Sequence, residues 1–165
     1  MERINDPCGV GVKFLVDCML GRLATWLRIL GFDASYYPEP YSRKICYTSI
    51  IEKRIILTRN KRVSPKRSFK VMHINYDLIQ DQIKQVVSEY KLTLYKNRLF
   101  SRCSYCNQQV QETSKSKLID IIPEYVYNTN DRFSQCPACK KIYWPGTHEK
   151  LLCAHLANLG IHLQV

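Results

Sequence analysis

The sequence predicts an α/β protein with a mainly parallel sheet and helices on both faces of that sheet, followed by a smaller cysteine-containing part and a C-terminal helix. Short apolar runs alternate with segments of helical periodicity up to about residue 90. The connections between these segments are short, which favours neighbouring parallel strands joined by helices. From residue 91 onward helical periodicity fades, and four of the eight cysteines form two Cys-x-x-Cys pairs.

The first strand and the first helix have the clearest pattern. Residues 12–16 are an apolar run broken only by Lys13, which suits a buried strand. A helix is expected next, because apolar residues recur at helical spacing while Arg22 and Arg28 fall on the opposite face. Gly31 is expected to end this helix. The apolar positions are Leu20, Leu23, Ala24, Leu27 and Leu30.

The remaining elements of the α/β part continue the alternation. Pro38 and Pro40 are expected to end the second strand, and Asp77 is expected to cap the last helix of this part. The buried stripe of that helix is Ile79, Ile83, Val86, Val87 and Tyr90. The predicted order is strand 33–37, helix 41–53, strand 54–58, strand 70–74 and helix 77–90.

Two polar residues follow strands of the predicted sheet. Asp17 ends the first strand, and Asn60 follows the third. In open parallel sheets, ligands bind outside the carboxyl ends of the strands. We therefore expect Asp17, Asn60 and the basic loop that begins at Arg59 to share one edge of the sheet.

The charge of the chain favours a polyanionic partner. Lysine and arginine outnumber the acidic residues 25 to 14, and the sequence pI is about 9.3. The excess is concentrated in residues 59–70, which hold six basic residues and no acid. A solvated basic surface without a partner is the alternative interpretation. The candidate nucleic-acid-binding residues are Arg59, Lys61, Arg62, Lys66, Arg67 and Lys70.

The two cysteine pairs predict a zinc site. Cys103 and Cys106, and then Cys136 and Cys139, have the spacing that directs two thiolates from one tight turn toward a single ion. Four sulfur ligands leave no open coordination position, so the zinc is expected to be structural. Disulfides or unligated thiols are the alternative, and His148 is a further candidate ligand.

The other four cysteines occur singly, which favours buried free thiols in a reducing compartment and an intracellular protein, cytoplasmic or nuclear. No apolar run approaches the roughly 18 residues that a membrane span requires. We expect two domains, the α/β domain over residues 1–98 and a zinc-ribbon subdomain with a C-terminal helix over residues 99–165. In that helix, Thr147 is the expected N-cap and Gly160 the expected stop.

Four segments together resemble the Mut-seven C-terminal RNase-domain family: "KFLVDCMLGRLATWLRILGFDASYY", "RIILTRN", "FSRCSYCN" and "FSQCPACKKIYWPGTH". The resemblance covers roughly residues 12–150. It implies a PIN-like nuclease fold joined to a zinc ribbon. Members occur as stand-alone prokaryotic proteins and as the C-terminal domain of animal 3′–5′ exonucleases of the DEDD type, including one used in small-RNA silencing in nematodes.

The resemblance also implies where a catalytic metal would bind. PIN-type nucleases hold Mg²⁺ or Mn²⁺ with three or four carboxylates at the carboxyl ends of the strands. Asp17 matches the first of these acids. The stretch 41–44 lacks the next acids, and Asn60 replaces the usual aspartate. Arg43 and Lys44 would also oppose a cation, so Asp17 and Asn60 are expected to mark a vestigial site.

The role of the remaining acids stays open from the sequence. Asp17 is expected to cap the following helix, and residual metal binding is the alternative. Asp33, Asp77 and Asp81 are candidate substitutes for the missing ligands, although Asp33 suits a turn.

The leading functional hypothesis is an RNA-binding module whose PIN-like site is degenerate and non-catalytic. Three tyrosines lie in the connection near this edge of the sheet: Tyr36, Tyr37 and Tyr41. Stacking of bases on these rings would favour single-stranded RNA, and ordinary packing of the rings is the alternative. The resemblance implies an associated 3′–5′ exoribonuclease, in cis or in trans, with a role in RNA processing or silencing. The alternatives are an active Mg²⁺- or Mn²⁺-dependent endoribonuclease and a protein-interaction platform for a ribonuclease complex.

Overall fold

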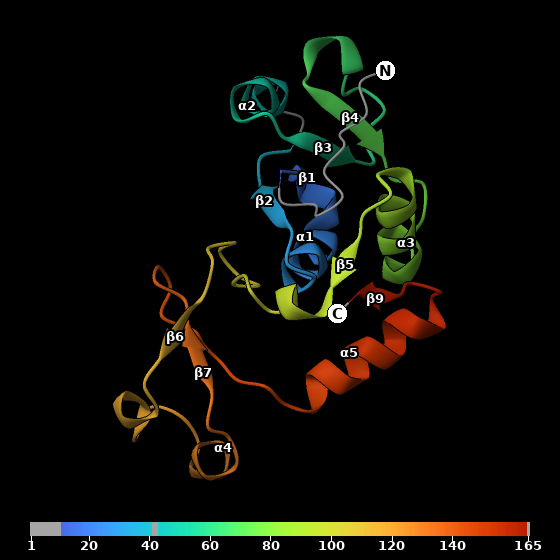
Figure 1. Cartoon of the computed structure of the whole chain (residues 1–165). Helices are drawn as coiled ribbons and strands as arrows, with labels where there is room; N and C mark the ends of the chain where they lie inside the picture. Colours follow the sequence, from blue (N-terminus) through green and yellow to red (C-terminus); the bar gives the residue numbers. More distant parts are fainter. Residues whose placement is uncertain (1–10, 41–42, 165) are drawn as a thin grey trace.

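The computed structural model describes residues 11–40 and 43–164 and contains a four-stranded parallel sheet (Figure 1). Buried apolar side chains dominate the two central strands, as expected for a parallel sheet covered on both faces. The strand order across the sheet is β2-β1-β3-β4. The strands are β1 (Lys13–Asp17), β2 (Asp33–Tyr37), β3 (Ile55–Thr58) and β4 (Lys70–His73).

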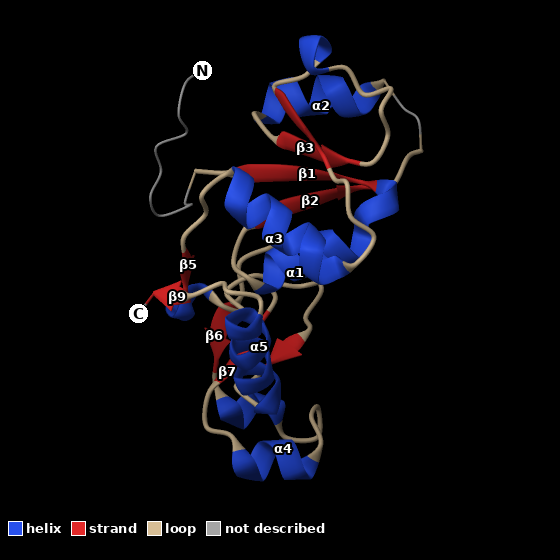
Figure 2. Ribbon diagram, turned by 90° about the vertical axis from the view of Figure 1, so that its right-hand side faces the viewer, coloured by secondary structure: helices blue, strands red, loops and turns tan. Residues whose placement is uncertain are grey.

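Helices cover both faces of this sheet, as the alternating pattern predicted. Figure 2 shows α1 (Gly21–Ile29) and α3 (Ile79–Glu89) on one face and α2 (Lys44–Glu52) on the other. The larger core lies under α1 and α3, around Phe14, Val16 and Leu27. A smaller core under α2 includes Leu15 and Ile56.

Gly31 ends α1 as expected, and its conformation explains why glycine is required. Its φ is +91°, in the left-handed region, and a Cβ placed there would lie 2.5 Å from the carbonyl oxygen of Arg98. The chain segment after α3 therefore passes directly against the end of α1.

The C-terminal helix α5 (Thr147–Asn158) packs onto the α/β core. Leu152, Leu156 and Ile161 belong to the same buried cluster as the α1 side chains. Trp26 of α1 and His155 of α5 have ring centroids 6.0 Å apart. The short strands β5 (Leu94–Tyr95) and β9 (Leu163–Gln164) pair in parallel beside this contact.

A separate antiparallel sheet forms the rest of the molecule, at the lower left of Figure 1. It consists of β6 (Gln111–Thr113), β7 (Phe133–Gln135) and β8 (Ile142–Tyr143), with α4 (Glu124–Thr129) at its far end. Short 3-10 turns complete the structure: η1 (Cys18–Leu20), η2 (Pro65–Arg67), η3 (Lys96–Arg98) and η4 (Lys115–Leu118).

The structure corrects three local expectations. Asp77 does not cap α3, whose N-cap is Leu78; the Asp77 carboxylate pairs instead with Arg59. Gly146, not Thr147, is the N-cap of α5. Arg28, expected on the polar face of α1, is only 6% exposed. Within the described ranges, none of the helices has the length and apolar character needed to cross a bilayer.

Candidate metal centre and nucleic-acid interface

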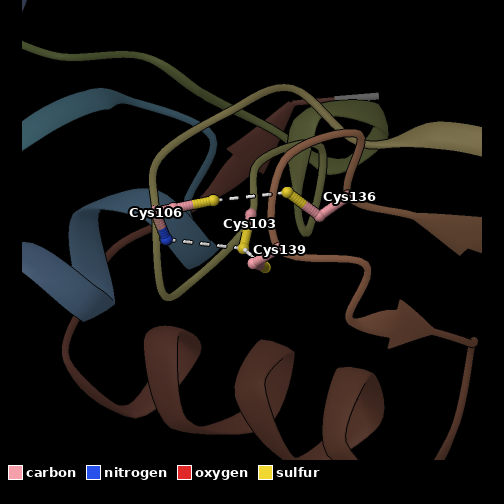
Figure 3. Close-up of side chains that lie close together, drawn as sticks. All are labelled: Cys103, Cys106, Cys136 and Cys139. Atoms are coloured by element: carbon pink, nitrogen blue, oxygen red, sulfur yellow. Dashed lines mark hydrogen bonds between the residues drawn. The ribbon is translucent and has the colours of Figure 1, made fainter.

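The four predicted cysteines converge on one point (Figure 3). The sulfur atoms of Cys103, Cys106, Cys136 and Cys139 all lie within 4.8 Å of one another. Sγ of Cys103 is 3.5 Å from Sγ of Cys139, and Sγ of Cys106 is 3.3 Å from Sγ of Cys136. Because zinc–sulfur bonds of about 2.3 Å place tetrahedral sulfurs about 3.8 Å apart, this donor set fits a structural zinc ion.

Hydrogen bonds favour the thiolate form of one cysteine in the cluster, Cys103. Burial raises the pKa of Cys103, but hydrogen bonds from the Tyr143 hydroxyl and from the backbone amides of Cys106 and Tyr105 outweigh it and lower the pKa to about 6. The Tyr143 hydroxyl lies 3.0 Å from Sγ of Cys103. It also accepts a hydrogen bond from the amide of Ser104 at 3.2 Å. Tyr143 therefore orients a candidate metal ligand from outside the cysteine set, a role the sequence did not indicate.

Arg28 connects the first cysteine turn, residues 103–106, to the parallel sheet through hydrogen bonds. Its Nε donates to the carbonyl oxygen of Ala34 at 2.7 Å, and its Nη1 donates to the carbonyl oxygen of Tyr105 at 2.6 Å. Burial lowers the pKa of Arg28 from its ordinary value, while the nearby Cys103 and Cys106 thiolates act in the opposite direction. This arginine thus links β2 to the turn that carries two metal ligands.

A second polar link joins the same parts through Asp33. Its carboxylate accepts hydrogen bonds from Arg54 at 2.5 Å and from the Asn107 side-chain amide at 2.8 Å. Asn107 also accepts a hydrogen bond from the backbone amide of Ala34 at 3.0 Å. Asp33 lies at the amino end of β2, whereas Asp17 lies at the carboxyl end of β1. Asp33 is therefore too far along the sheet to replace a missing metal ligand beside Asp17.

Asp17 is buried at the carboxyl edge and accepts a hydrogen bond from the hydroxyl of Thr58 on the neighbouring strand. It makes no capping hydrogen bond to the helical turn that follows, so the predicted capping role is wrong. Register and strand alternation place Tyr37, Asp17, Thr58 and His73 in one row on the α2 face. His73, which the sequence reasoning did not single out, has a buried Nδ1 without a hydrogen-bond partner among the described residues.

Asn60 has a local structural role at the end of β3. Its side-chain oxygen accepts a hydrogen bond from the backbone amide of Arg62 at 2.9 Å. Its backbone amide donates a hydrogen bond to the Thr58 hydroxyl at 2.9 Å. This is the Asx-type turn that asparagine favours. Directly before it, Arg59 pairs with Asp77 at 2.6 Å. Both residues are thus engaged with protein atoms at the edge where a catalytic metal would bind.

The described residues bring no acidic trio together. Among them, the four cysteines are the only group of three or more His, Cys, Asp or Glu side chains near enough to share an ion. The His148 side chain and Tyr41 lie outside what the structure describes.

The basic loop is exposed, but it does not stay at the carboxyl edge. Arg59, Lys61 and Arg62 follow the end of β3 there, whereas Lys70 pairs in register with Ile55 at the opposite end of the sheet. The expectation that the whole loop shares one edge is therefore wrong for Lys70, because a parallel strand must start where its neighbour starts. The loop follows the α2 face as it returns, with Val63 buried in the smaller core.

The tyrosines near this edge are engaged with protein atoms. The Tyr36 hydroxyl donates to the carbonyl oxygen of Cys18 at 3.1 Å, although the residue is 41% exposed. Tyr37 packs against the smaller core, and its hydroxyl donates to Glu39. Of Tyr36 and Tyr37, only Tyr36 thus combines a fixed ring with substantial exposure.

The fold is a parallel sheet with helices on both faces, joined to a small antiparallel sheet whose four-cysteine cluster is consistent with a zinc ribbon. The model of the Mut7-C RNAse domain matches residues 12–156, and the chain belongs to that family. This confirms the resemblance seen in the sequence. No significant match was found among curated proteins or among solved structures.

Proposed function

We propose that this chain binds single-stranded RNA through the basic loop of residues 59–70 and does not itself cut it. Membership of an RNase-domain family makes RNA the expected ligand class. The observation that carries the proposal is the loop itself, in which Lys61, Arg62, Lys66 and Arg67 are all exposed. Phosphates that contact them would release counterions, which supplies most of the affinity of sequence-independent binding.

The lack of cleavage is inferred from how the remaining polar groups are used. A catalytic Mg²⁺ or Mn²⁺ needs several oxygen ligands with net negative charge. Here the Asp17 carboxylate bonds Thr58, the Asn60 oxygen bonds a backbone amide, and Asp77 pairs with Arg59. We propose that such a module holds RNA for an associated 3′–5′ exoribonuclease, in cis or in trans.

Two other functions have an observation in their favour. A metal-dependent ribonuclease is supported by the family and by Asp17 and Asp77 near the carboxyl edge, where Asp77 contacts the residue after β3. A protein-interaction platform is supported by apolar side chains exposed on α2.

One assay separates binding from cleavage. Labelled single-stranded RNA is incubated with the protein in EDTA, Mg²⁺ or Mn²⁺, at two salt concentrations. We expect uncut RNA to shift in all three conditions, with an affinity that falls as salt rises. Replacing Lys61, Arg62, Lys66 and Arg67 with glutamate should abolish the shift at the higher salt and reduce the slope of log affinity against log salt by about 3, since each phosphate contact on a single strand contributes about 0.7.

A matched variant controls for total charge. Lys84, Lys91, Lys117 and Lys150 are exposed and lie outside the loop, so changing them to glutamate alters the net charge equally. The control should retain most of the binding; equal losses in both variants would contradict a localised site. Cleavage that requires Mg²⁺ or Mn²⁺ and disappears in Asp17→Asn would replace the proposal with the ribonuclease alternative.

A further inference from the structure

The outward face of α2 exposes three large apolar side chains within one turn of helix. Tyr47 is 69% exposed, Ile50 is 49% exposed and Ile51 is 63% exposed. Their spacing of i, i+3 and i+4 places them on one side. The opposite side holds the helix to the sheet through the buried residues Ile45 and Ser49. Single exposed apolar residues are ordinary, but a cluster on one helix face marks an interaction surface.

Phe69 directly precedes β4, and its backbone contacts Ser49 on the sheet-facing side of α2. Its backbone amide donates to Oγ of Ser49 at 3.2 Å, and that hydroxyl donates to the carbonyl oxygen of Arg54 at 2.6 Å. The chain entering β4 is therefore held beside α2, while Phe69 remains 42% exposed. We call Tyr47, Ile50 and Ile51 the α2 patch.

A basic hollow adjoins the α2 patch. The hollow has a volume of about 480 Å³ and shares Ile51 with the patch. Lys13, Lys53 and Arg54 also line it, together with a single acid, Glu52. Glu52 already pairs with Arg54 at 2.5 Å, so Lys13 and Lys53 give the hollow its net positive charge.

We propose that the α2 patch and the basic hollow bind an acidic amphipathic helix of a partner protein. An amphipathic helix presents apolar side chains at i, i+3, i+4 and i+7 on one face, and that face can cover the apolar side chains of α2. Acidic side chains beside those anchors meet Lys13 and Lys53. Ile50 and Ile51 are aliphatic and give a base nothing to stack on, although Tyr47 offers one aromatic face, so RNA is the competing ligand in the test below. The inference is independent of the proposed RNA binding by residues 59–70.

The test uses a designed 20-residue helical peptide with leucines at i, i+3, i+4 and i+7 and glutamates at the flanking positions. Binding is measured by fluorescence anisotropy and mapped by amide chemical-shift changes in the whole chain. We expect saturable binding whose chemical-shift changes centre on the outward face of α2. The double variant Ile50→Ser/Ile51→Ser should weaken binding at least tenfold.

Two matched comparisons keep the test specific. Ile119 and Ile121 are exposed to a similar degree on the ribbon side, at 56% and 64%, so Ile119→Ser/Ile121→Ser should change affinity less than twofold. A version of the peptide with lysines in place of the glutamates should bind at least tenfold more weakly. Lys13→Glu/Lys53→Glu should reverse that preference.

Several outcomes would overturn the proposal. These are absence of peptide binding, shifts centred elsewhere, or equal losses in the two isoleucine pairs. Loss of single-stranded RNA binding in Ile50→Ser/Ile51→Ser, without peptide binding to the parent chain, would assign the surface to RNA. Self-association of the parent chain that this variant abolishes in sedimentation would assign it to a second copy.

Discussion

At the scale of single residues, Asp33 carries more of the structure than its place at the start of a strand suggests. It receives hydrogen bonds from Arg54 of the sheet and from Asn107 of the first cysteine turn. Burial raises its pKa, but these hydrogen bonds and the charges of Arg54 and Arg102 outweigh burial and lower the pKa below its ordinary value of 3.8. The ionised form is therefore stabilised by folding.

We predict that Asp33→Asn lowers the free energy of unfolding by about 2 kcal/mol near neutral pH, because a half-buried Arg54 loses its charged partner. Urea unfolding monitored by circular dichroism measures this change. A loss below about 0.5 kcal/mol, the usual range for surface substitutions, would mean that the pair contributes little.

The same variant tests the pH dependence of stability. A carboxylate whose pKa is lowered in the folded state contributes stability above its ordinary pKa, and that contribution is lost as pH falls through the folded-state pKa. The difference between the parent and Asp33→Asn should therefore be constant from about pH 7 to about pH 5 and shrink below about pH 4. A difference that grows with acidity would contradict the assigned direction.

Tyr143 provides the corresponding prediction for the metal centre. Its hydroxyl donates to Sγ of Cys103, so Tyr143→Phe removes a hydrogen bond from outside the ligand set. Zinc affinity should fall by about 10- to 100-fold, the usual effect of losing such a partner. Competition with a chromophoric chelator measures the affinity. Tyr125→Phe, on an exposed side chain in α4, is the control and should leave it unchanged.

At the scale of elements, two glycines allow the cost of steric contact to be measured apart from the cost of a strained backbone conformation. Gly31 and Gly160 both have positive φ, at +91° and +71°, but a Cβ added at Gly31 would meet the Arg98 backbone, whereas one added at Gly160 would meet no described atom within 4 Å. Gly160→Ala should cost about 1 kcal/mol from conformation alone. Gly31→Ala should exceed that by about 2 kcal/mol, as overpacking requires. Equal losses in thermal unfolding would show that the end of α1 can move away from Arg98.

The path of the basic loop is set by the positions of the two strands that it connects, β3 and β4. Its first basic residues follow the carboxyl end of β3, and Lys70 begins β4 at the other end of the sheet. The four residues of β3 are separated by three steps of about 3.3 Å, so these ends lie roughly 10 Å apart. RNA that contacts both Arg62 and Lys70 must therefore pass along the α2 face instead of lying only across the strand ends.

At the scale of the whole molecule, we expect the candidate zinc site and the α/β core to contribute separately to stability. The antiparallel strands β6, β7 and β8 bury few large side chains, whereas α5 contributes Leu152 and Leu156 to the main core. Metal binding and folding are coupled in small zinc domains.

We predict that Cys103→Ser, or chelation of the metal, unfolds the ribbon and leaves the α/β core with α5 folded. Hydrogen exchange should become fast in β6 to β8 and remain slow in β1, β3 and α1. Metal analysis of the parent chain, purified without chelator, should return one zinc ion. No zinc in the parent, or a ribbon that stays protected after Cys103→Ser, would refute the four-cysteine site.

Local patterns in the sequence were sufficient to predict the helices and strands of the α/β part, the C-terminal helix and the candidate metal ligands. Helical and strand periodicity, the conformation required at Gly31 and the Cys-x-x-Cys spacing are properties of short chain segments, so they could be read without knowing the fold. The local cluster of basic residues after Arg59 is a property of the same kind. The parallel sheet followed from the alternation of these segments.

The partners of individual side chains, in contrast, came from the tertiary structure. Arg28 looks like a polar-face residue, but the cysteine turn covers it and uses its donors. Asp17 looked like a helix cap, but the register of β1 and β3 places the Thr58 hydroxyl against it. The position of Lys70 at the amino end of the sheet depends on where the chain returns to begin β4. Such partners lie far apart in sequence, and they are fixed by the register of the sheet and by the path of the chain between strands. Local periodicity carries no information about register or about that path.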